Sequence, residues 1–363
     1  MILDTTYTKK HLQNMQSQYA PKVDISILER TVFAFGLLDA LVRSGLQFIF
    51  KGGTSLILLC NIPKRLSTDI DIIVSPNISV DTYLDSISTI FPFMRKVEDI
   101  RVPQNNIIKR HIKYFYQSPI TGYDNYILLD ILFEENHYAN LIERQINIPL
   151  LLYTEKNTQS IVKVPSVGSI LADKLTAFAP HTTGILIDAN KDMEIMKQLY
   201  DIITLLNMDF DIKEVFDTYP QIVRTECAYR NLDLSATDIL IDTLKASLCI
   251  CSQGKLFNNN NEYDNHYKKG INSLKTHIFQ LKFNSNIIAE DSTKLIYFLI
   301  CLLTKSQYSN EVIEVNKKFQ FTNPAFGTMR YIQKVNPIAF SYLVKADKLI
   351  SQNNNIMLLF NQT

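Results

Sequence analysis

Residues 51–74, KGGTSLILLCNIPKRLSTDIDIIV, carry the pattern that decides the fold. A glycine pair, Gly52 and Gly53, opens a short helical run, and Asp69 and Asp71 follow in a β-branched segment typical of a strand. Side chains two apart on a strand point to the same face, so we predict that the two carboxylates lie side by side. Their repulsion would be costly without a cation, and the pair therefore predicts a divalent metal site.

The glycine pair is placed to bring a helix start close to a ligand. The preceding apolar run, residues 46–50 (LQFIF), is predicted to be a strand. We expect Thr54 or Ser55 to cap the following helix, which continues through Leu59. Free N–H groups and the helix dipole at such a start attract phosphate. A glycine pair before a helix also fits an ordinary turn, and only the nearby aspartates favour the phosphate role.

These blocks resemble the nucleotidyltransferase superfamily that includes DNA polymerase β, whose signature is a glycine-based loop and helix followed by a strand with two alternating acids. Within it, the chain is similar to the AbiEii/AbiGii-type toxins, a family that also includes the MenT toxins. The family's first blocks, GGT-x-L and R-x-S-x-D-I-D, are matched by Gly52, Gly53, Thr54 and Leu56, and then by Arg65, Ser67, Asp69, Ile70 and Asp71. The resemblance implies an enzyme with an NTP co-substrate and Mg²⁺ or Mn²⁺ as cofactor.

The superfamily has a third acid on a neighbouring strand, and the apolar run 126–133 (YILLDILF) offers Asp130. The run 111–116 (HIKYFY) alternates basic or polar with apolar residues and suits an antiparallel partner strand. An acid at a strand end or facing solvent would be the structural alternative, because a buried lone acid is costly. With the upstream pair, the resemblance implies that Asp130 is the third metal ligand.

Two further blocks of the toxin family follow. The segment 167–178 (VGSILADKLTAF) has helical spacing and carries Lys174, a compact charge suited to a triphosphate. The segment 197–205 (KQLYDIITL) carries Asp201, where the family has an acid. Asp201 either holds Lys174 in place or helps to take a proton from the acceptor hydroxyl. For both residues the alternative is a solvated position on a helix.

The second block adds two polar residues with open roles. Arg65 contacts either a phosphate or a nucleobase, and Ser67 either binds phosphate or shapes the turn. The resemblance thus implies three sets of site residues. The catalytic residues are Asp69, Asp71, Asp130, Lys174 and Asp201, the metal ligands are Asp69, Asp71 and Asp130, and the nucleotide-binding residues are Gly52, Gly53, Thr54, Ser55, Arg65, Ser67 and Lys174.

The 363 residues, 46% of them hydrophobic, are enough for two domains with substantial cores. We expect an α+β fold: a polymerase β-like nucleotidyltransferase domain over 1–165, with a mixed sheet flanked by helices, and a helical domain over 166–363 that closes the cleft with Lys174 and Asp201 lining it. Helical spacing predicts a helix over 25–43 and, in the second half, helices over 167–179, 192–207, 211–230, 235–251, 291–304 and 337–350. The polar, asparagine-rich stretch 252–270 is predicted to be a mobile surface loop.

Composition also limits location and partners. The chain has no apolar run of ~18 residues and its first residues lack a signal-peptide pattern, so we expect a cytoplasmic protein with no membrane partner. The five cysteines lack paired metal spacing and are expected to be reduced thiols. A net charge of +1 does not by itself indicate polyanion binding.

The family resemblance implies transfer of an NMP from an NTP to an acceptor hydroxyl, with RNA, at the tRNA 3′ end, as the target. It further implies a toxin with a cognate antitoxin, acting in a toxin–antitoxin or abortive-infection pair for phage defence. One alternative is a nucleotidyltransferase that modifies a protein or a small molecule. The other is an inactive relative that only binds a nucleotide or a partner, although the intact set of Asp69, Asp71 and Asp130 argues against it.

Overall fold

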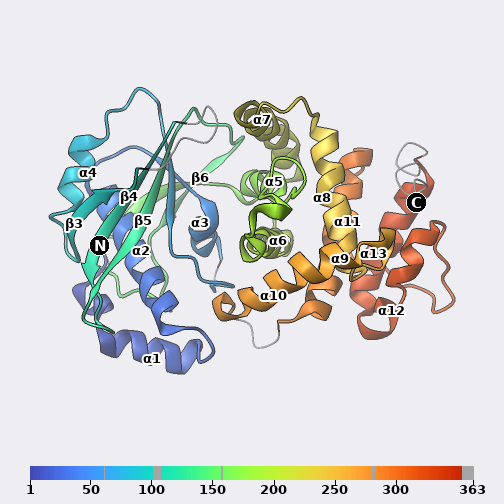
Figure 1. The fold of residues 1–363 in the computed structure, drawn as a ribbon, viewed down its shortest axis with the longest axis horizontal. Coiled ribbons are helices and arrows are strands. Elements are labelled where there is room, and N and C mark those ends of the chain that lie inside the picture. The colour runs from blue at the N-terminus through green and yellow to red at the C-terminus, as the bar shows by residue number, and fades with distance from the viewer. Residues whose placement is uncertain (61, 101–107, 157, 280–282, 354–363) are drawn as a thin grey trace. The chain divides into compact units, whose positions relative to one another are not determined.

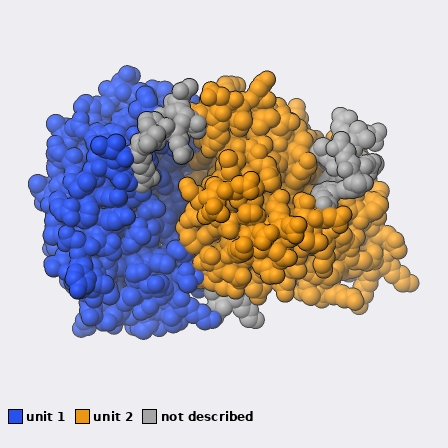
Figure 2. All heavy atoms as spheres, in the orientation of Figure 1, with its two compact units in different colours: residues 1–166, 276–281 blue, residues 167–275, 282–363 orange. Residues whose placement is uncertain are grey.

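The computed structural model describes residues 1–60, 62–100, 108–156, 158–279 and 283–353. The chain divides into two compact units, one of Met1–Ser166 with Thr276–Leu281 and one of Val167–Lys275 with Lys282–Thr363 (Figure 2). None of the helices in the described ranges is long and apolar enough to cross a membrane. The five cysteines, all within the described residues, form no disulfide bond, and four of them are buried.

The first unit is built on a seven-stranded mixed sheet with the order β3-β4-β5-β2-β1-β7-β6 (Figure 1). Its strands are β1 (Ile49–Lys51), β2 (Ile70–Val74), β3 (Phe93–Glu98), β4 (Lys109–Gln117), β5 (Asp124–Phe133), β6 (Leu141–Gln145) and β7 (Ile161–Pro165). The pairs β2–β5 and β1–β7 are parallel, while β1–β2, β3–β4, β4–β5 and β6–β7 are antiparallel. This mixed sheet with flanking helices confirms the α+β prediction, including the antiparallel partnership of the runs 111–116 and 126–133.

Helices of the first unit pack on this sheet. They are α1 (Lys9–Tyr19), α2 (Ile25–Arg43), α3 (Gly52–Leu59) and α4 (Asp81–Ile87), with a 3₁₀ turn, η1 (Asp4–Tyr7), before them. The Phe33 ring of α2 stacks on the Tyr116 ring of β4 with centroids 3.7 Å apart, and the Tyr114 hydroxyl donates to the carbonyl of Leu84 in α4 at 2.9 Å. Helices α2 and α4 therefore cover one face of the sheet.

The burial of β5 shows which side chains point the other way. Ile127, Leu129 and Ile131 are buried, whereas Leu128 and Asp130 between them are only partly covered. Since side chains alternate along a strand, the apolar set packs under the helices and Asp130 points to the opposite face. That opposite face carries the candidate site.

The second unit is helical throughout its long elements. These are α5 (Val167–Ala177), α6 (Asp192–Leu206), α7 (Ile212–Arg230), α8 (Ala236–Cys251), α11 (Ser285–Thr304) and α13 (Pro337–Ser351), with the shorter α12 (Ile332–Val335) and the 3₁₀ segments η2 (Ile187–Ala189) and η6 (Pro324–Met329). The 3₁₀ turn η5 (Lys275–His277) begins in this unit and ends in the first. The ends follow capping chemistry: Ser235 and Asp238 form a capping box before α8, and the Asn284 side chain accepts from the first N–H groups of α11. The six predicted helices of this half are confirmed, with α11 starting earlier than expected.

The stretch 252–270 is not the mobile surface loop that its composition predicted. It forms helical turns: η3 (Leu256–Asn258), α9 (Asn260–Glu262), the π-helical η4 (Tyr263–Tyr267) and the start of α10 (Lys268–Leu274). Tyr263 and Tyr267 are only 5% and 1% exposed, and the Tyr267 hydroxyl donates to Glu262 Oε1 at 2.8 Å. The prediction was wrong because two tyrosines one turn apart anchor a segment whose average composition is polar.

Candidate active site

A single row of side chains crosses four strands of the first unit. Lys51 of β1 lies opposite Asp71 of β2, Asp71 lies opposite Asp130 of β5, and Asp130 lies opposite His111 of β4. Neighbouring strands are ~4.8 Å apart, and residues in register point to the same face. The structure therefore brings together Asp71 and Asp130, which are far apart in sequence, between a lysine and a histidine.

The first acid of the block lies just outside this row. Asp69 immediately precedes β2, and its Oδ1 is 3.4 Å from Arg30 Nη2. Its backbone carbonyl accepts a 2.5 Å hydrogen bond from the Thr54 hydroxyl, which ties the start of α3 to the start of β2. The glycine block and the acid block are thus joined directly.

Helix α3 begins beside the second acid. Gly52 has a positive φ of +77°, which lets the chain turn from β1 straight into the helix. A Cβ at this position would lie 2.0 Å from Asp71 Oδ2. The bare backbone of Gly52 is therefore what allows the helix N-terminus and the carboxylate to approach each other.

We expect the change Gly52→Ala to disturb the site. The added methyl group would collide with Asp71, and alanine at positive φ costs about 1 kcal/mol or more. Transfer activity should fall with a modest drop in melting temperature, measured by thermal unfolding. The matched control is Gly122→Ala, at a turn where φ is +78° but no heavy atom lies within 4 Å of the added Cβ. Equal activity in the two variants would show that the contact with Asp71 is unimportant.

Thr54 and Ser55 do not cap the helix as we expected. Lys51 occupies the N-cap position and makes no side-chain capping bond. Thr54 and Ser55 are fully buried in the first turn, and the Ser55 hydroxyl donates to the Gly52 carbonyl at 2.8 Å. The expectation failed because the positive φ of Gly52 starts the helix earlier, so the Ser55 hydroxyl bonds within the first turn and the Thr54 hydroxyl bonds to the Asp69 carbonyl.

The loop with Arg65 and Ser67 folds against the same helix start. A Cβ on Gly53 would be 2.4 Å from Arg65 Nη2 and 3.2 Å from Ser67 Oγ. Arg65 is only 7% exposed, and its Nη1 donates to the carbonyl of Leu66 at 3.0 Å. Both residues of the second block therefore lie against Gly53, in the first turn of α3. The Arg65 guanidinium also stabilises its own loop.

A remote segment holds this loop in position. Arg65 forms a β-bridge with Ile278, the Leu66 N–H donates to the His277 carbonyl at 2.8 Å, and the Phe279 N–H donates to the Lys64 carbonyl at 3.1 Å. The segment carries no motif, so sequence reasoning missed it. Its role is structural support of the Arg65 loop.

The donor set suits a divalent cation, although the side chains are not preassembled around one. Asp69, Asp71 and Asp130 offer only carboxylate oxygens, the ligands that Mg²⁺ prefers. Among the described residues, no three His, Cys, Asp or Glu side chains converge as a ready metal cluster. Asp69 pairs with Arg30, and Asp130 pairs with His111. Carboxylates that repel one another are stabilised by such hydrogen-bond donors. The carboxylates of Asp71 and Asp130, which are in register on parallel strands, are the part of this set that suits a shared cation.

His111 is a site residue that the motif comparison did not mark. Its imidazole Nδ1 is 2.6 Å from Asp130 Oδ1, a charge-assisted distance. The predicted pairing of the runs 111–116 and 126–133 contained the signal, because it places a histidine on the strand next to the third acid. The register that joins these two residues was not fixed by the sequence.

Lys174 and Asp201 meet inside the second unit. Lys174 Nζ lies 3.0 Å from Asp201 Oδ2, and the two side chains are 8% and 2% exposed. The same Nζ donates to Gln198 Oε1 at 2.8 Å. The solvated alternatives are therefore wrong for both residues, and the geometry agrees with an acid that holds the lysine in place.

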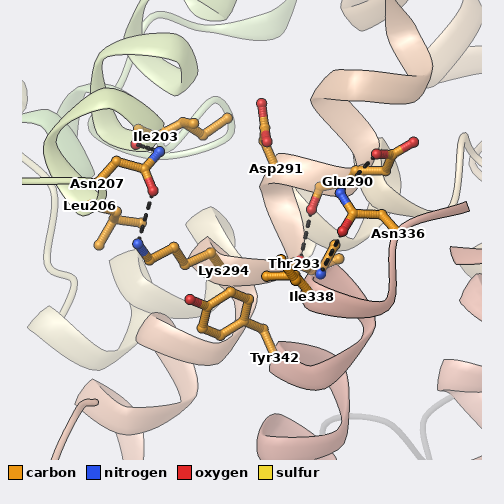
Figure 3. Close-up of a pocket in the computed structure, with 11 residues that line it drawn as sticks. Ile203, Leu206, Asn207, Glu290, Asp291, Thr293, Lys294, Asn336, Ile338 and Tyr342 are labelled. Atoms are coloured by element: carbon orange, nitrogen blue, oxygen red, sulfur yellow. Dashed lines mark hydrogen bonds between the residues drawn. The ribbon is translucent and has the colours of Figure 1, made fainter. Parts of the chain in front are cut away.

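A cavity of the second unit is lined by none of these residues. It has a volume of about 140 Å³ and is lined from α6, α11 and α13 (Figure 3). Lys294 Nζ donates to Asn207 Oδ1 at 2.9 Å on one side, and burial raises the pKa of Asp291 to about 6 on the other. Because none of the family-block residues lines it, we do not assign the cavity to the candidate site.

Two solved structures match the chain in a structural comparison. One is JHP933 from Helicobacter pylori, with 13% identity, a TM-score of 0.44, and coverage of 76% of this chain and 94% of that chain. The other is a candidate nucleotidyltransferase from H. pylori, with 12% identity, a TM-score of 0.45, and coverage of 77% and 99%. No curated protein matches the chain.

A family model covers most of the two units. It describes the nucleotidyl transferase AbiEii toxin of type IV toxin–antitoxin systems and matches residues 36–277. The matched range contains the glycine turn, the paired acids and the buried Lys174–Asp201 pair. The chain therefore belongs to the AbiEii nucleotidyltransferase toxin family, whose toxins have cognate antitoxins.

Proposed function

We propose that this nucleotidyltransferase moves an NMP from an NTP to a hydroxyl at the 3′ end of tRNA and depends on a divalent metal. One observation carries the proposal: Asp71 and Asp130 lie in register on parallel strands, with the start of α3 against Asp71. Two adjacent carboxylates and a helix N-terminus together provide for a cation and for the phosphates it accompanies.

The first turn of α3 is proposed to hold phosphate. Its N–H groups carry the positive end of the helix dipole, and the glycine pair adds no side chain of its own there. Arg65 brings a guanidinium to within 2.4 Å of the position that a Gly53 Cβ would occupy, which adds positive charge at the same place. Ser67 lies beside Arg65, and its hydroxyl can donate a hydrogen bond to phosphate.

The acids are proposed to hold Mg²⁺ or Mn²⁺. Asp69, Asp71 and Asp130 would be the ligands, and the bound ion would supply positive charge to the triphosphate and to the attacking hydroxyl. Lys51 follows in the same cross-strand row and adds a fixed cation. Because Gly52 has no side chain, the Asp71 carboxylate can lie directly against the start of α3.

Lys174 is proposed as a cation for the leaving phosphates. Asp201 and Gln198 hold its ammonium group in place. The side chain therefore has little rotamer freedom left to lose when phosphate binds. Asp201 is then a positioning residue that acts through the lysine. This assignment follows the third and fourth family blocks.

Replacing Lys174 by alanine should weaken NTP binding and transfer together. A charged hydrogen bond contributes roughly 1.5–3 kcal/mol, so kcat/KM should fall about ten- to a hundredfold. The measurements are NTP affinity by titration calorimetry and initial transfer rates. Lys197→Ala is the matched control, since that lysine is on α6 and pairs with Glu194 at 3.6 Å.

The Lys174 assignment has a clear failing outcome. Because the change also removes the ammonium group 3.0 Å from the buried Asp201 carboxylate, the variant's melting temperature must be measured beside its activity. Lys174→Arg keeps the charge and should retain part of the activity. Unchanged NTP affinity in a folded Lys174→Ala protein would show that the lysine serves only the core.

Sequencing of tRNA 3′ ends after induction in a bacterial host tests the proposed acceptor. We expect growth arrest and extended tRNA ends with the wild-type chain, and neither with Asp71→Asn. Addition of nucleotides to the 3′ end blocks aminoacylation of each molecule, so arrest needs little enzyme. Arrest with unaltered tRNA would instead point to a protein or small-molecule acceptor.

A further inference from the structure

The face of the sheet that carries Asp130 continues along three strands away from the acids. On β4 and β5, the pairs Lys113–Leu128 and Phe115–Tyr126 follow the His111–Asp130 pair in register. On β3, Arg95 is the partner of Phe115. Alternation puts all of these side chains on the face opposite to α2 and α4.

Aromatic rings and cations alternate in space on this face. The Phe115 and Tyr126 ring centroids are 5.6 Å apart, the Arg95 guanidinium lies 3.6 Å over the Phe115 ring, and the Lys113 ammonium lies 5.2 Å from the Tyr126 ring centroid. Tyr126 is 36% exposed. We name these four residues, Arg95, Lys113, Phe115 and Tyr126, the aromatic strip.

We propose that the aromatic strip binds the unpaired nucleotides of a single-stranded RNA acceptor end. Nucleobases stack on aromatic rings and on guanidinium planes, and cations beside the rings meet the phosphates. The inference rests on the proposed function, because it assigns a binding surface to the acceptor of the same reaction. It adds the surface and the residues that the family blocks do not mark.

The distance along the sheet agrees with such a path. Tyr126 is four residues from Asp130 on β5, which corresponds to ~13 Å at ~3.3 Å per residue. Stacked nucleotides rise ~3.4 Å each, so about four of them span this distance. A terminal hydroxyl at the acids therefore leaves the preceding bases over Tyr126 and over the Arg95 guanidinium that covers the Phe115 ring.

The charges favour a polyanion over an apolar protein segment. Arg95 is 3.2 Å from Asp124, and Lys113 is 3.1 Å from Asp99. The Arg95–Asp124 pair is largely exposed, and exposed pairs contribute only ~0–1 kcal/mol, so an RNA phosphate can compete with the carboxylate. An apolar segment would instead have to desolvate both cations without replacing their partners.

RNA binding by a conservative variant tests this surface. The probe is a fluorescein-labelled single-stranded RNA octamer, measured by anisotropy with the full chain. Tyr126→Leu keeps an apolar side chain but removes the stacking ring, and its Kd should rise roughly five- to a hundredfold. Tyr123→Ala is the control, because that tyrosine is 77% exposed in the turn before β5.

The outcomes separate this proposal from the proposed function. A higher octamer Kd for Tyr126→Leu supports the aromatic strip if the octamer Kd of Tyr123→Ala and the NTP affinity are unchanged. This holds whether or not RNA is the transfer acceptor. An unchanged octamer Kd in a folded Tyr126→Leu protein overturns the strip, even if the wild-type enzyme labels RNA. Weaker association with an apolar peptide or the antitoxin, at unchanged RNA affinity, overturns it in favour of a protein partner.

Discussion

Replacing Asp71 by alanine is expected to lower the rate of nucleotide transfer by about 10³-fold or more while the protein stays folded. Asp71 is in register with Asp130 and lies against Gly52, so its loss removes the charge at the centre of the row. In the proposed mechanism this carboxylate would hold the divalent cation that meets the reacting phosphate, and it is not part of the apolar core. Initial rates with labelled NTP and thermal unfolding of the same sample measure the two effects.

Two comparisons make the Asp71 result interpretable. Asp69→Ala should show a similar loss, because the two acids belong to one block. Asp85→Ala removes an exposed acid of α4 that pairs with Lys96 at 3.1 Å, and it should leave the rate unchanged. Near wild-type turnover in folded Asp71→Ala would remove the paired acids from the mechanism.

Asp201→Ala is expected to reduce the free energy of unfolding by about 3–5 kcal/mol. The change leaves the Lys174 ammonium in the interior with its 3.0 Å carboxylate partner gone, and Gln198 alone cannot neutralise the charge. Urea unfolding followed by circular dichroism measures the loss. Few single changes in the second unit should cost as much.

A double variant separates stability from activity at this pair. Lys174→Met with Asp201→Leu replaces the buried charges by apolar side chains of similar length, and such replacements are often neutral for folding. We expect the double variant to recover most of the stability and little of the transfer activity. If the midpoint of urea unfolding of Asp201→Ala equalled that of the wild type, Lys174 and Asp201 would not form a buried ion pair.

Local patterns accounted for much of the fold and for the centre of the site. The helix α2 and the six long helices of the second half follow from helical spacing, and the β5 strand follows from its apolar run. Asp71 could be predicted from its spacing with Asp69, and Asp130 from the third acid that the family resemblance implies. Their pairing in register is a property of the sheet, which only the structure shows.

The remainder depended on contacts between distant parts of the chain. The backbone bonds that tie Lys64 and Leu66 to residues 277–279 have no side-chain signature, so no pattern marks them. The contact of His111 with Asp130 depends on strand register, and a slip of one residue would turn the histidine to the other face. The stretch 252–270 was misjudged because average polarity concealed two anchoring tyrosines.

The most direct measurement of the central claim is transfer of label from an α-labelled NTP by the purified chain. Reactions would contain total RNA, no added acceptor, or small hydroxylated compounds, each with Mg²⁺ or with a chelator, and each with wild type or Asp71→Asn. We predict label in RNA of tRNA size only with wild type, metal and RNA present together. Label transferred equally by Asp71→Asn, or transferred in the presence of the chelator, would contradict the account.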